Sequence, residues 1–278
     1  MLFHVTVDGQ PRWASGAPDT GPDQLLTDQR LDDLLAAAGS LTGWPAEGPL
    51  PAGTRLLPPV ESQPVWAAGV TFGRSRSART EESTTPDVYD LVYSAERPEL
   101  FVKALPGMVV GPGGAVAVRA DSTWDVPEPE VGLVLNAAGR IVALVLGDDV
   151  SSRGIEGDNP LYLPQAKVYD GSCALGPGLL PVEEAPSWPE ISVRLVVRRD
   201  ERVLIDDESA LRDMVRRPDE LVRWLYRGLT FPVGAVLLTG TSLVPPPEFT
   251  LLAGDEVHIS ATGLGELTTG VESTKDEW

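Results

Sequence analysis

Short apolar stretches recur along the chain, and they predict strands far more often than helices. The first, Leu2 to Val7, is followed by Asp8-Gly9, a pair typical of a tight hairpin turn. Other stretches are bounded by Gly, Pro or Asp, and they predict strands over residues 64–69, 99–104, 108–110, 115–120, 129–135, 140–147, 191–198, 201–205, 235–239, 256–260 and 266–271. Strands in irregular order with few helices favour a mixed β-rich (α+β) fold over a doubly wound one.

Leucines with helical spacing predict an amphipathic helix over residues 23–38. Another helix is predicted over residues 218–227, where proline stands in the first turn and glycine follows the end. Residues 45–59 carry five prolines and two glycines, a composition typical of a linker. We therefore expect a small N-terminal α/β module over residues 1–60 and a larger domain over residues 64–278.

The chain is strongly acidic, with 41 acidic against 22 basic residues and a formal net charge of −19. Binding to nucleic acid or to anionic lipid needs clustered lysine and arginine, so we expect neither as a partner. No apolar run approaches the ~18 residues of a membrane helix, and no signal-peptide pattern is present. The single cysteine, Cys173, cannot form an internal disulfide. We expect a soluble cytoplasmic protein.

Histidine and lysine are both scarce. The two histidines, His4 and His258, lie near opposite ends of the chain, so no Ser/His/Asp triad can be argued. Three lysines stand against 19 arginines. Because lysine can release its proton near neutral pH and arginine cannot, Lys103 and Lys167 are candidates for function.

The strongest constellation is Glu128-Pro-Glu130 at the start of a predicted strand. Residues two apart in a strand point to one face, so both carboxylates share a face. If the hairpin closes symmetrically about residues 137–138, Glu128 lies across from Gly147, and Asp149 emerges just beyond. Three carboxylates then converge.

Three carboxylates offer only oxygen ligands, which favours a hard cation such as Mg²⁺, with Mn²⁺ or Ca²⁺ as alternatives. They fill about half of an octahedron and leave positions for water and a bidentate α-keto acid. A solvated acidic hairpin edge in an acidic protein has the same spacing. The spacing alone therefore leaves both interpretations open.

Further candidates come from the strands and loops nearby. Lys167 follows Asp149 by eighteen residues and could act in acid–base chemistry, or only form an ion pair. Glu99 and Lys103 share a strand face, which suggests either a site wall or an ion pair at a sheet edge. Thr241 closes a Thr-Gly-Thr sequence that could hold a carboxylate or only form a turn.

Seven ordered motifs resemble the fumarylacetoacetate hydrolase superfamily over residues 64–271. They are Glu99-Leu-Phe-Val-Lys103, Glu128-x-Glu130, Asp148-Asp149-Val-Ser-Ser-Arg153, Lys167, Leu175-Gly-Pro177, Phe231-Pro-x-Gly and Leu238-Thr-Gly-Thr241. The resemblance implies a β-roll core with a variable N-terminal module and homo-oligomers of two or four chains. It also implies a Mg²⁺, Mn²⁺ or Ca²⁺ site at Glu128, Glu130 and Asp149, beside Lys167.

One segment departs from the hydrolases of that superfamily. Those enzymes usually carry Tyr, His and Glu on a lid after the first core strand. Here the lid carries Phe72, Arg74 and Ser75, and Ser75 stands about where the histidine belongs. Without a His–Glu pair to activate water, hydrolysis of a carbon–carbon bond is disfavoured.

Other segments resemble the sugar-acid dehydratases of the superfamily: Gly69-Val-Thr71, residues 95–101, Asp121-Ser-Thr-Trp124, Pro127-Glu-Pro-Glu130 and residues 156–165. This resemblance implies Mg²⁺-dependent dehydration of a 2-keto-3-deoxy sugar acid, of the type that converts 2-keto-3-deoxy-D-arabinonate to 2,5-dioxopentanoate in pentose oxidation. It implies Lys167 and Glu99 as catalytic groups, and as substrate contacts Lys103, Thr241, Phe72, Arg74 and Ser75.

Three alternatives stay open. The first is a carbon–carbon hydrolase of the acylpyruvate or fumarylacetoacetate type. The second is a metal-dependent decarboxylase or isomerase of an oxo-acid, and the third is a keto-acid-binding protein without catalytic activity. The expected partner is a small oxo-acid in every case.

Overall fold

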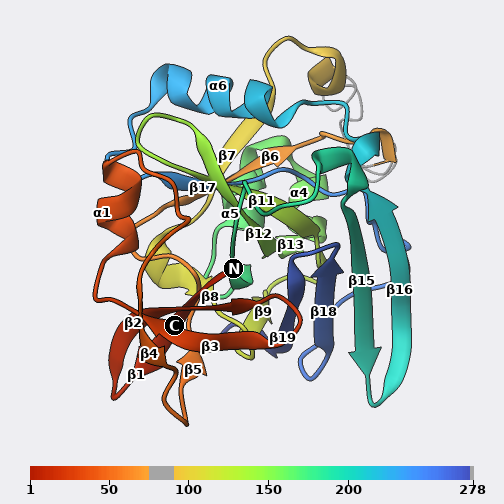
Figure 1. Cartoon of the computed structure of the whole chain (residues 1–278). Coiled ribbons are helices and arrows are strands. Elements are labelled where there is room, and N and C mark those ends of the chain that lie inside the picture. The colour runs from red at the N-terminus through yellow and green to blue at the C-terminus, as the bar shows by residue number, and fades with distance from the viewer. Residues whose placement is uncertain (75–90, 276–278) are drawn as a thin grey trace.

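The computed structural model describes residues 1–74 and 91–275, which form three sheets (Figure 1). The largest has twelve strands, with the order β4-β3-β2-β1-β14-β12-β11-β17-β6-β7, and with β5 beside β1 and β8 beside β14. Its strands are β1 (Leu2–Val7), β2 (Gln10–Ala17), β3 (Gly21–Leu26), β4 (Ala46–Pro49), β5 (Arg55–Leu56), β6 (Val65–Gly69), β7 (Glu99–Ala104), β8 (Val109–Val110), β11 (Pro129–Leu135), β12 (Ile141–Asp149), β14 (Cys173–Pro181) and β17 (Ala235–Leu238).

Two smaller sheets and a few short helices complete the described part of the chain. The five-stranded sheet runs β16-β15-β18-β19-β9, and a two-stranded ribbon joins β10 to β13. These strands are β9 (Ala115–Val118), β10 (Asp125–Val126), β13 (Ser151–Ser152), β15 (Ser192–Arg199), β16 (Arg202–Ala210), β18 (Glu256–Ala261) and β19 (Gly265–Ser273). The α-helices that lie wholly within the described residues are α1 (Leu31–Ala36), α4 (Arg153–Asp158), α5 (Leu163–Lys167) and α6 (Pro218–Gly228).

The expectation of a mixed β-rich fold is confirmed. Most neighbouring strands are antiparallel, while β17 and β6, β14 and β8, and β19 and β9 run parallel. Helix α6 crosses one end of the molecule, and the long β15–β16 hairpin lies along one side (Figure 1). No described helix is long and apolar enough to cross a membrane.

The helix predicted over residues 23–38 was only partly right. Leu25 and Leu26 belong to β3, where they are buried and paired with β2 and β4. The helix begins at Leu31 and ends at Ala36. Leucine spacing is compatible with both structures over so short a distance, and pairing on both edges of β3 decides the outcome.

The central strands β11 and β12 are buried on both faces, which explains their continuous apolar sequences. Leu133 and Leu144 pack into one hydrophobic cluster, whereas their neighbours Val134 and Val145 pack into another. Alternate residues of one strand thus serve two cores. This double burial fixes the ends of the two strands, where the acidic residues lie.

The hairpin register differs from the predicted one by two residues. Glu130, not Glu128, lies across from Gly147. The pairing shifts at a bulge between Val134 and Leu135, close to the loop, so the hairpin does not close symmetrically about residues 137–138. As a result the backbone N–H of Asp149 donates to the carbonyl of Glu128 at 3.0 Å.

The predicted division at residues 60–64 stays a prediction. Strand β1 of the N-terminal segment pairs with β14, and Leu2 lies across from Leu179. The large sheet therefore continues from the N-terminal strands into the strands of the core (Figure 1).

Candidate metal and oxo-acid site

Three carboxylates meet where the β11–β12 hairpin ends. Glu128 directly precedes β11, Glu130 lies in β11, and Asp149 is the last residue of β12. One ligand oxygen from each lies within 4.8 Å of the others, and all three residues are buried. The predicted convergence is therefore present, and these residues are not a solvated hairpin edge.

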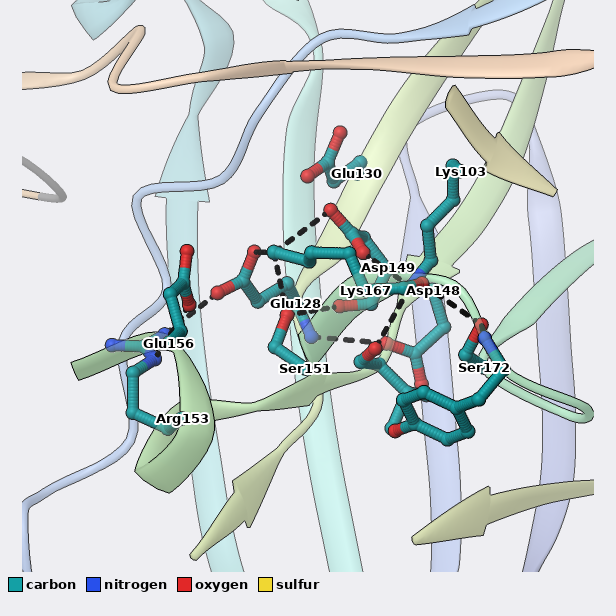
Figure 2. A network of polar contacts seen from close by, with 12 residues as sticks. Lys103, Glu128, Glu130, Asp148, Asp149, Ser151, Arg153, Glu156, Lys167 and Ser172 are labelled. Carbon is teal, nitrogen blue, oxygen red and sulfur yellow. Dashed lines mark hydrogen bonds and ion pairs between the residues drawn. The ribbon is translucent and has the colours of Figure 1, made fainter. Parts of the chain in front are cut away.

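Two cations contact Glu128 from neighbouring elements (Figure 2). Lys167, the last residue of α5, donates from Nζ to Glu128 Oε2 at 2.7 Å and to Asp149 Oδ2 at 3.0 Å. Its third contact is Ser151 Oγ, at 2.5 Å. Arg153, the first residue of α4, donates from Nη2 to Glu128 Oε1 at 2.6 Å. Lys167 therefore forms an ion pair with two of the three carboxylates.

Lys103 approaches Asp149 from a different direction than Lys167 (Figure 2). Its Nζ lies 2.6 Å from Asp149 Oδ1 and donates to the carbonyls of Val150 and Lys167, at 2.8 and 2.6 Å. The side chain has no solvent exposure. Lys103 joins β7, the end of β12 and the end of α5.

Glu130 is held by the backbone at a glycine. The N–H of Gly240 donates to Glu130 Oε2 at 2.6 Å. Gly240 has φ +88, and a Cβ there would lie 2.1 Å from Thr71 Oγ1, so only glycine fits. Of the two alternatives left open for the Thr-Gly-Thr sequence, the structure has the one in which it holds a carboxylate, but that carboxylate is Glu130 of the protein itself.

The electrostatics of the three carboxylates favour a cation. Burial raises the pKa of Glu130 well above its ordinary value, and the nearby charges of Asp149 and Glu128 raise it further. Buried like charges repel unless a positive group lies among them. Three carboxylate oxygens at this separation fit a hard divalent ion. Lys103, Lys167 and Arg153 pair with Asp149 and Glu128, whereas Glu130 accepts the backbone N–H of Gly240.

Asp148 supports the loop that carries Glu128. Its Oδ1 accepts the backbone N–H of Glu128 at 2.9 Å, and the residue has no solvent exposure. Burial raises the pKa of Asp148 to about 7. The side chain of Asp148 thus holds the backbone of Glu128 in place.

A small cavity of ≈ 20 Å³ lies over the carboxylates. Its walls include six predicted site residues, namely Glu99, Glu128, Glu130, Asp149, Lys167 and Thr241. They come from β7, the β11–β12 hairpin, α5 and the segment after β17, which are far apart in the sequence. The six residues, which span more than 140 positions from Glu99 to Thr241, thus lie around one cavity.

The other predicted substrate contacts do not line this cavity in the described structure. Lys103 is fully enclosed behind Asp149. Phe72 packs its side chain into the main hydrophobic cluster, and its backbone forms a β-bridge with Met214. Arg74 is exposed and pairs with Asp207 at 3.2 Å. Ser75 lies outside the described residues.

Two polar residues of the cavity wall, Arg153 and Glu156, were not assigned to the site from the sequence. They lie three residues apart in α4, and Arg153 Nε is 3.8 Å from Glu156 Oε2. Both are buried despite their charge. The sequence held one signal for them: Arg153 and Glu156 carry opposite charges three residues apart, shortly after Asp149.

Comparison with known proteins places this site in a class of metal-dependent enzymes on a mixed β-roll. Residues 87–272 match the family described as "Fumarylacetoacetate (FAA) hydrolase C-terminal". The chain is 51% identical over 213 residues to a "Probable 2-keto-3-deoxyxylonate dehydratase" from Haloferax volcanii, which covers 77% of this chain and 73% of that one.

Two further similarities involve proteins with related names. A "2-dehydro-3-deoxy-D-arabinonate dehydratase" from Saccharolobus solfataricus is 37% identical, over 80% of this chain and 76% of that one. A solved structure of a "2-keto-3-deoxy-D-arabinonate dehydratase complexed with magnesium and 2,5-dioxopentanoate" superposes with a TM-score of 0.87 at 30% identity, over 99% of each chain. The chain belongs to the fumarylacetoacetate hydrolase family, as the resemblance of its motifs implied.

Proposed function

We propose that this protein is a Mg²⁺-dependent hydro-lyase that dehydrates a 2-keto-3-deoxy sugar acid, of the type that forms 2,5-dioxopentanoate from 2-keto-3-deoxy-D-arabinonate. The observation that carries the proposal is the buried trio of carboxylates on a cavity wall that also holds Lys167 and Glu99. The dehydratase names of its relatives support the same reaction.

Glu128, Glu130 and Asp149 would hold the metal ion. Mg²⁺ is preferred by such an all-oxygen ligand set, and Mn²⁺ or Ca²⁺ can use the same oxygens. A bound divalent ion supplies Lewis acidity to a C2 carbonyl, which makes the protons on C3 easier to remove. The small oxo-acid partner would thus be bound through its carboxylate end.

Lys167 and Glu99 are the groups we assign to proton transfer. The Nζ of Lys167 donates hydrogen bonds to three acceptors. Three donated bonds use all three protons of a charged ammonium group, which can act as a proton donor. Glu99 lines the cavity outside the metal trio and fits the role of proton acceptor. Glu99 takes the proton from C3, and Lys167 protonates the C4 hydroxyl as it leaves as water. This elimination leaves a C3=C4 double bond. Transfer of a proton from C5 to C3 moves the double bond to C4=C5, and the resulting enol gains a proton at C4 and loses its hydroxyl proton to become an aldehyde at C5.

Turnover of a 2-keto-3-deoxypentonate with added Mg²⁺ tests this proposal. We expect the C5 aldehyde to form, to disappear after chelation and to return with Mg²⁺. Glu128→Gln should lower turnover by at least ~100-fold, because a neutral amide is a poor ligand for Mg²⁺. Glu256→Gln, in an exposed residue of β18, is the matched control.

Other outcomes identify the alternatives. Unchanged turnover by metal-free protein would overturn the metal role. Carbon–carbon cleavage products or CO₂ would indicate a hydrolase or decarboxylase, and binding without turnover would indicate a keto-acid-binding protein.

A second part of the proposal concerns the oligomeric state of the protein and its location in the cell. From the family resemblance we propose a cytoplasmic homo-oligomer of two or four chains. Light scattering of the purified protein measures its molar mass, and the mass of a single chain would contradict the proposed oligomer.

A further inference from the structure

Glu130 is held differently from the other two carboxylates of the trio. Glu128 and Asp149 accept hydrogen bonds from lysine and arginine side chains, whereas Glu130 accepts the backbone N–H of Gly240 at 2.6 Å. Glu130 also stands apart from the contacts drawn in Figure 2. Because Glu130 is only 2% exposed, bulk water cannot readily replace this bond. The orientation of one peptide group therefore affects where the Glu130 carboxylate lies.

The same peptide group is also held at its other end. The carbonyl of Thr239 and the N–H of Gly240 belong to one planar peptide group. Thr71 donates from Oγ1 to this carbonyl at 2.6 Å, and neither threonine is exposed to solvent. Hydrogen bonds in series polarise one another, so the bond at the carbonyl strengthens the bond from the N–H to Glu130.

This peptide group has little else to fix its orientation. Strand β17 ends at Leu238, so the peptide lies beyond the strand, and Gly240 has φ +88. Glycine accepts many backbone conformations, so rotation of this peptide is sterically permitted. If the peptide turned over, the carbonyl of Thr239 would face the carboxylate of Glu130 and repel it. The hydroxyl of Thr71 opposes this rotation.

The chain reaches Thr71 through a strained residue. Val70 has φ +52, a conformation that is rare for a β-branched residue, and it lines the ≈ 20 Å³ cavity. On its other side, the carbonyl of Thr71 accepts the N–H of Val215 at 2.9 Å. Strained residues persist where the surrounding structure holds them, and they are concentrated at functional sites. The bonds made by Thr71 supply such a hold beside the trio.

We propose that Thr71 is a positioning residue for the metal site: its hydroxyl holds the carbonyl of Thr239, and this keeps the N–H of Gly240 directed at Glu130. The inference rests on the proposed function, since it assumes that Glu130 binds the metal ion. Thr71 is not among the described residues that line the cavity, so it acts through the peptide group and not by contact with the substrate.

The test compares two substitutions that differ in what they keep. Thr71→Val keeps the size and branching of the side chain and loses the hydroxyl, whereas Thr71→Ser keeps the hydroxyl and loses a methyl group. Calorimetric titration of metal-free protein with Mg²⁺ should give a Kd for Thr71→Val at least ~10-fold above that of the wild type. The Kd of Thr71→Ser should stay within ~3-fold of the wild type, because the hydroxyl restores the bond.

Tyr226→Phe is the matched control. It also removes a hydroxyl that donates to a backbone carbonyl, that of Asn136 at 2.7 Å, but in the loop at the far end of the β11–β12 hairpin. Its Kd for Mg²⁺ should equal that of the wild type. Thr71→Ala also removes the hydroxyl and gives the measurement if Thr71→Val does not fold. An unchanged Kd without the hydroxyl, or equal weakening in Thr71→Val and Thr71→Ser, overturns the inference.

The outcomes also separate this inference from the proposed function. Dehydration by the wild type together with an unchanged Kd in Thr71→Val overturns the inference alone. The expected order of Kd values without any dehydration overturns the proposed reaction alone. Wild-type protein that binds no Mg²⁺ overturns both.

Discussion

Lys103 and Lys167 perform different tasks, although both belong to the three lysines that this arginine-rich chain contains. Lys167 faces the cavity and contacts Glu128 and Asp149. Within the described residues, Lys103 pairs with the carboxylate of Asp149, donates to the carbonyls of Val150 and Lys167, and lies over the ring of Tyr169. Lys103 is not among the described residues that line the cavity. We therefore interpret it as a residue that orients Asp149 and the end of α5.

Lys103→Met tests this interpretation through metal affinity. Loss of the oriented carboxylate should weaken Mg²⁺ binding by about 10–100-fold, the effect typical of residues that hold a metal ligand in place. Removal of a positive charge alone would strengthen Mg²⁺ binding, so the sign of the change is decisive. Calorimetric titration with Mg²⁺ measures it, and Lys275→Met at an exposed position is the control. Tighter binding would mean that Lys103 only balances charge.

The pairing of β6 with β7 positions Glu99. Gly69 at the end of β6 lies across from Glu99 at the start of β7. A Cβ on Gly69 would be 2.0 Å from Glu99 Oε2, so the absence of a side chain leaves room for this carboxylate. Gly69 therefore allows the carboxylate of Glu99, the proposed proton acceptor, to occupy its observed position.

Gly69→Ala should displace the Glu99 carboxylate without moving Glu128, Glu130 or Asp149. Because the clash involves the end of a flexible side chain, we expect the protein to fold, to bind Mg²⁺ normally and to lose at least ~10-fold in turnover. Steady-state kinetics and Mg²⁺ titration measure the two effects. The control is Gly270→Ala in β19, where a Cβ would meet nothing within 4 Å. Unimpaired turnover of Gly69→Ala would argue against proton transfer by Glu99.

The bounds of many strands could be predicted from the sequence, whereas the way the strands pair was harder to predict. Apolar stretches between Gly, Pro and Asp gave β11 and β6 nearly to the residue. The register of the β11–β12 hairpin was missed, because a bulge leaves no clear trace in the apolar pattern. Glu128, Glu130 and Asp149 were found because two of them are close in sequence and the third closes the same hairpin.

The cavity wall differs from the predicted set of site residues where long-range packing decides the position of a side chain. Nothing in the sequence distinguishes a lysine on the cavity wall from one behind it, so Lys103 was placed among the substrate contacts. Phe72 was assigned by its position in a motif, while its contact with Met214 arises only in the folded protein. Glu156 belongs to a short helix whose exposed and buried sides the sequence does not mark.

The pH dependence of stability is a property of the whole molecule, to which buried carboxyl groups contribute. Asp125 of β10 is 2% exposed, and burial raises its pKa from 3.8 to about 6. A carboxyl with a raised pKa in the folded state contributes stability at low pH, and this contribution is lost as pH rises through the folded pKa. Asp125 should therefore destabilise the protein increasingly between about pH 4 and pH 6.

Asp125→Asn should remove this dependence, since an amide does not ionise. In metal-free buffer the variant should melt a few degrees above the wild type at pH 7.5, and the difference should shrink towards pH 4. Thermal unfolding followed by circular dichroism measures it. Asp121→Asn should have the opposite sign at neutral pH, because the hydrogen bond from Arg119 lowers the pKa of Asp121. If the difference in melting temperature between Asp125→Asn and the wild type does not change with pH, ionisation of Asp125 does not account for it.

The pairing of β1 with β14 has a practical consequence for anyone who shortens this chain. Deleting the first sixty residues would remove β1, which pairs with β14 at Leu2 and Leu179, and would leave that part of β14 as an open edge of the sheet. Open edges of this kind recruit other chains and promote aggregation. Recombinant versions intended for crystallisation or engineering should therefore retain the N-terminal strands, even though every carboxylate of the proposed active site lies beyond them.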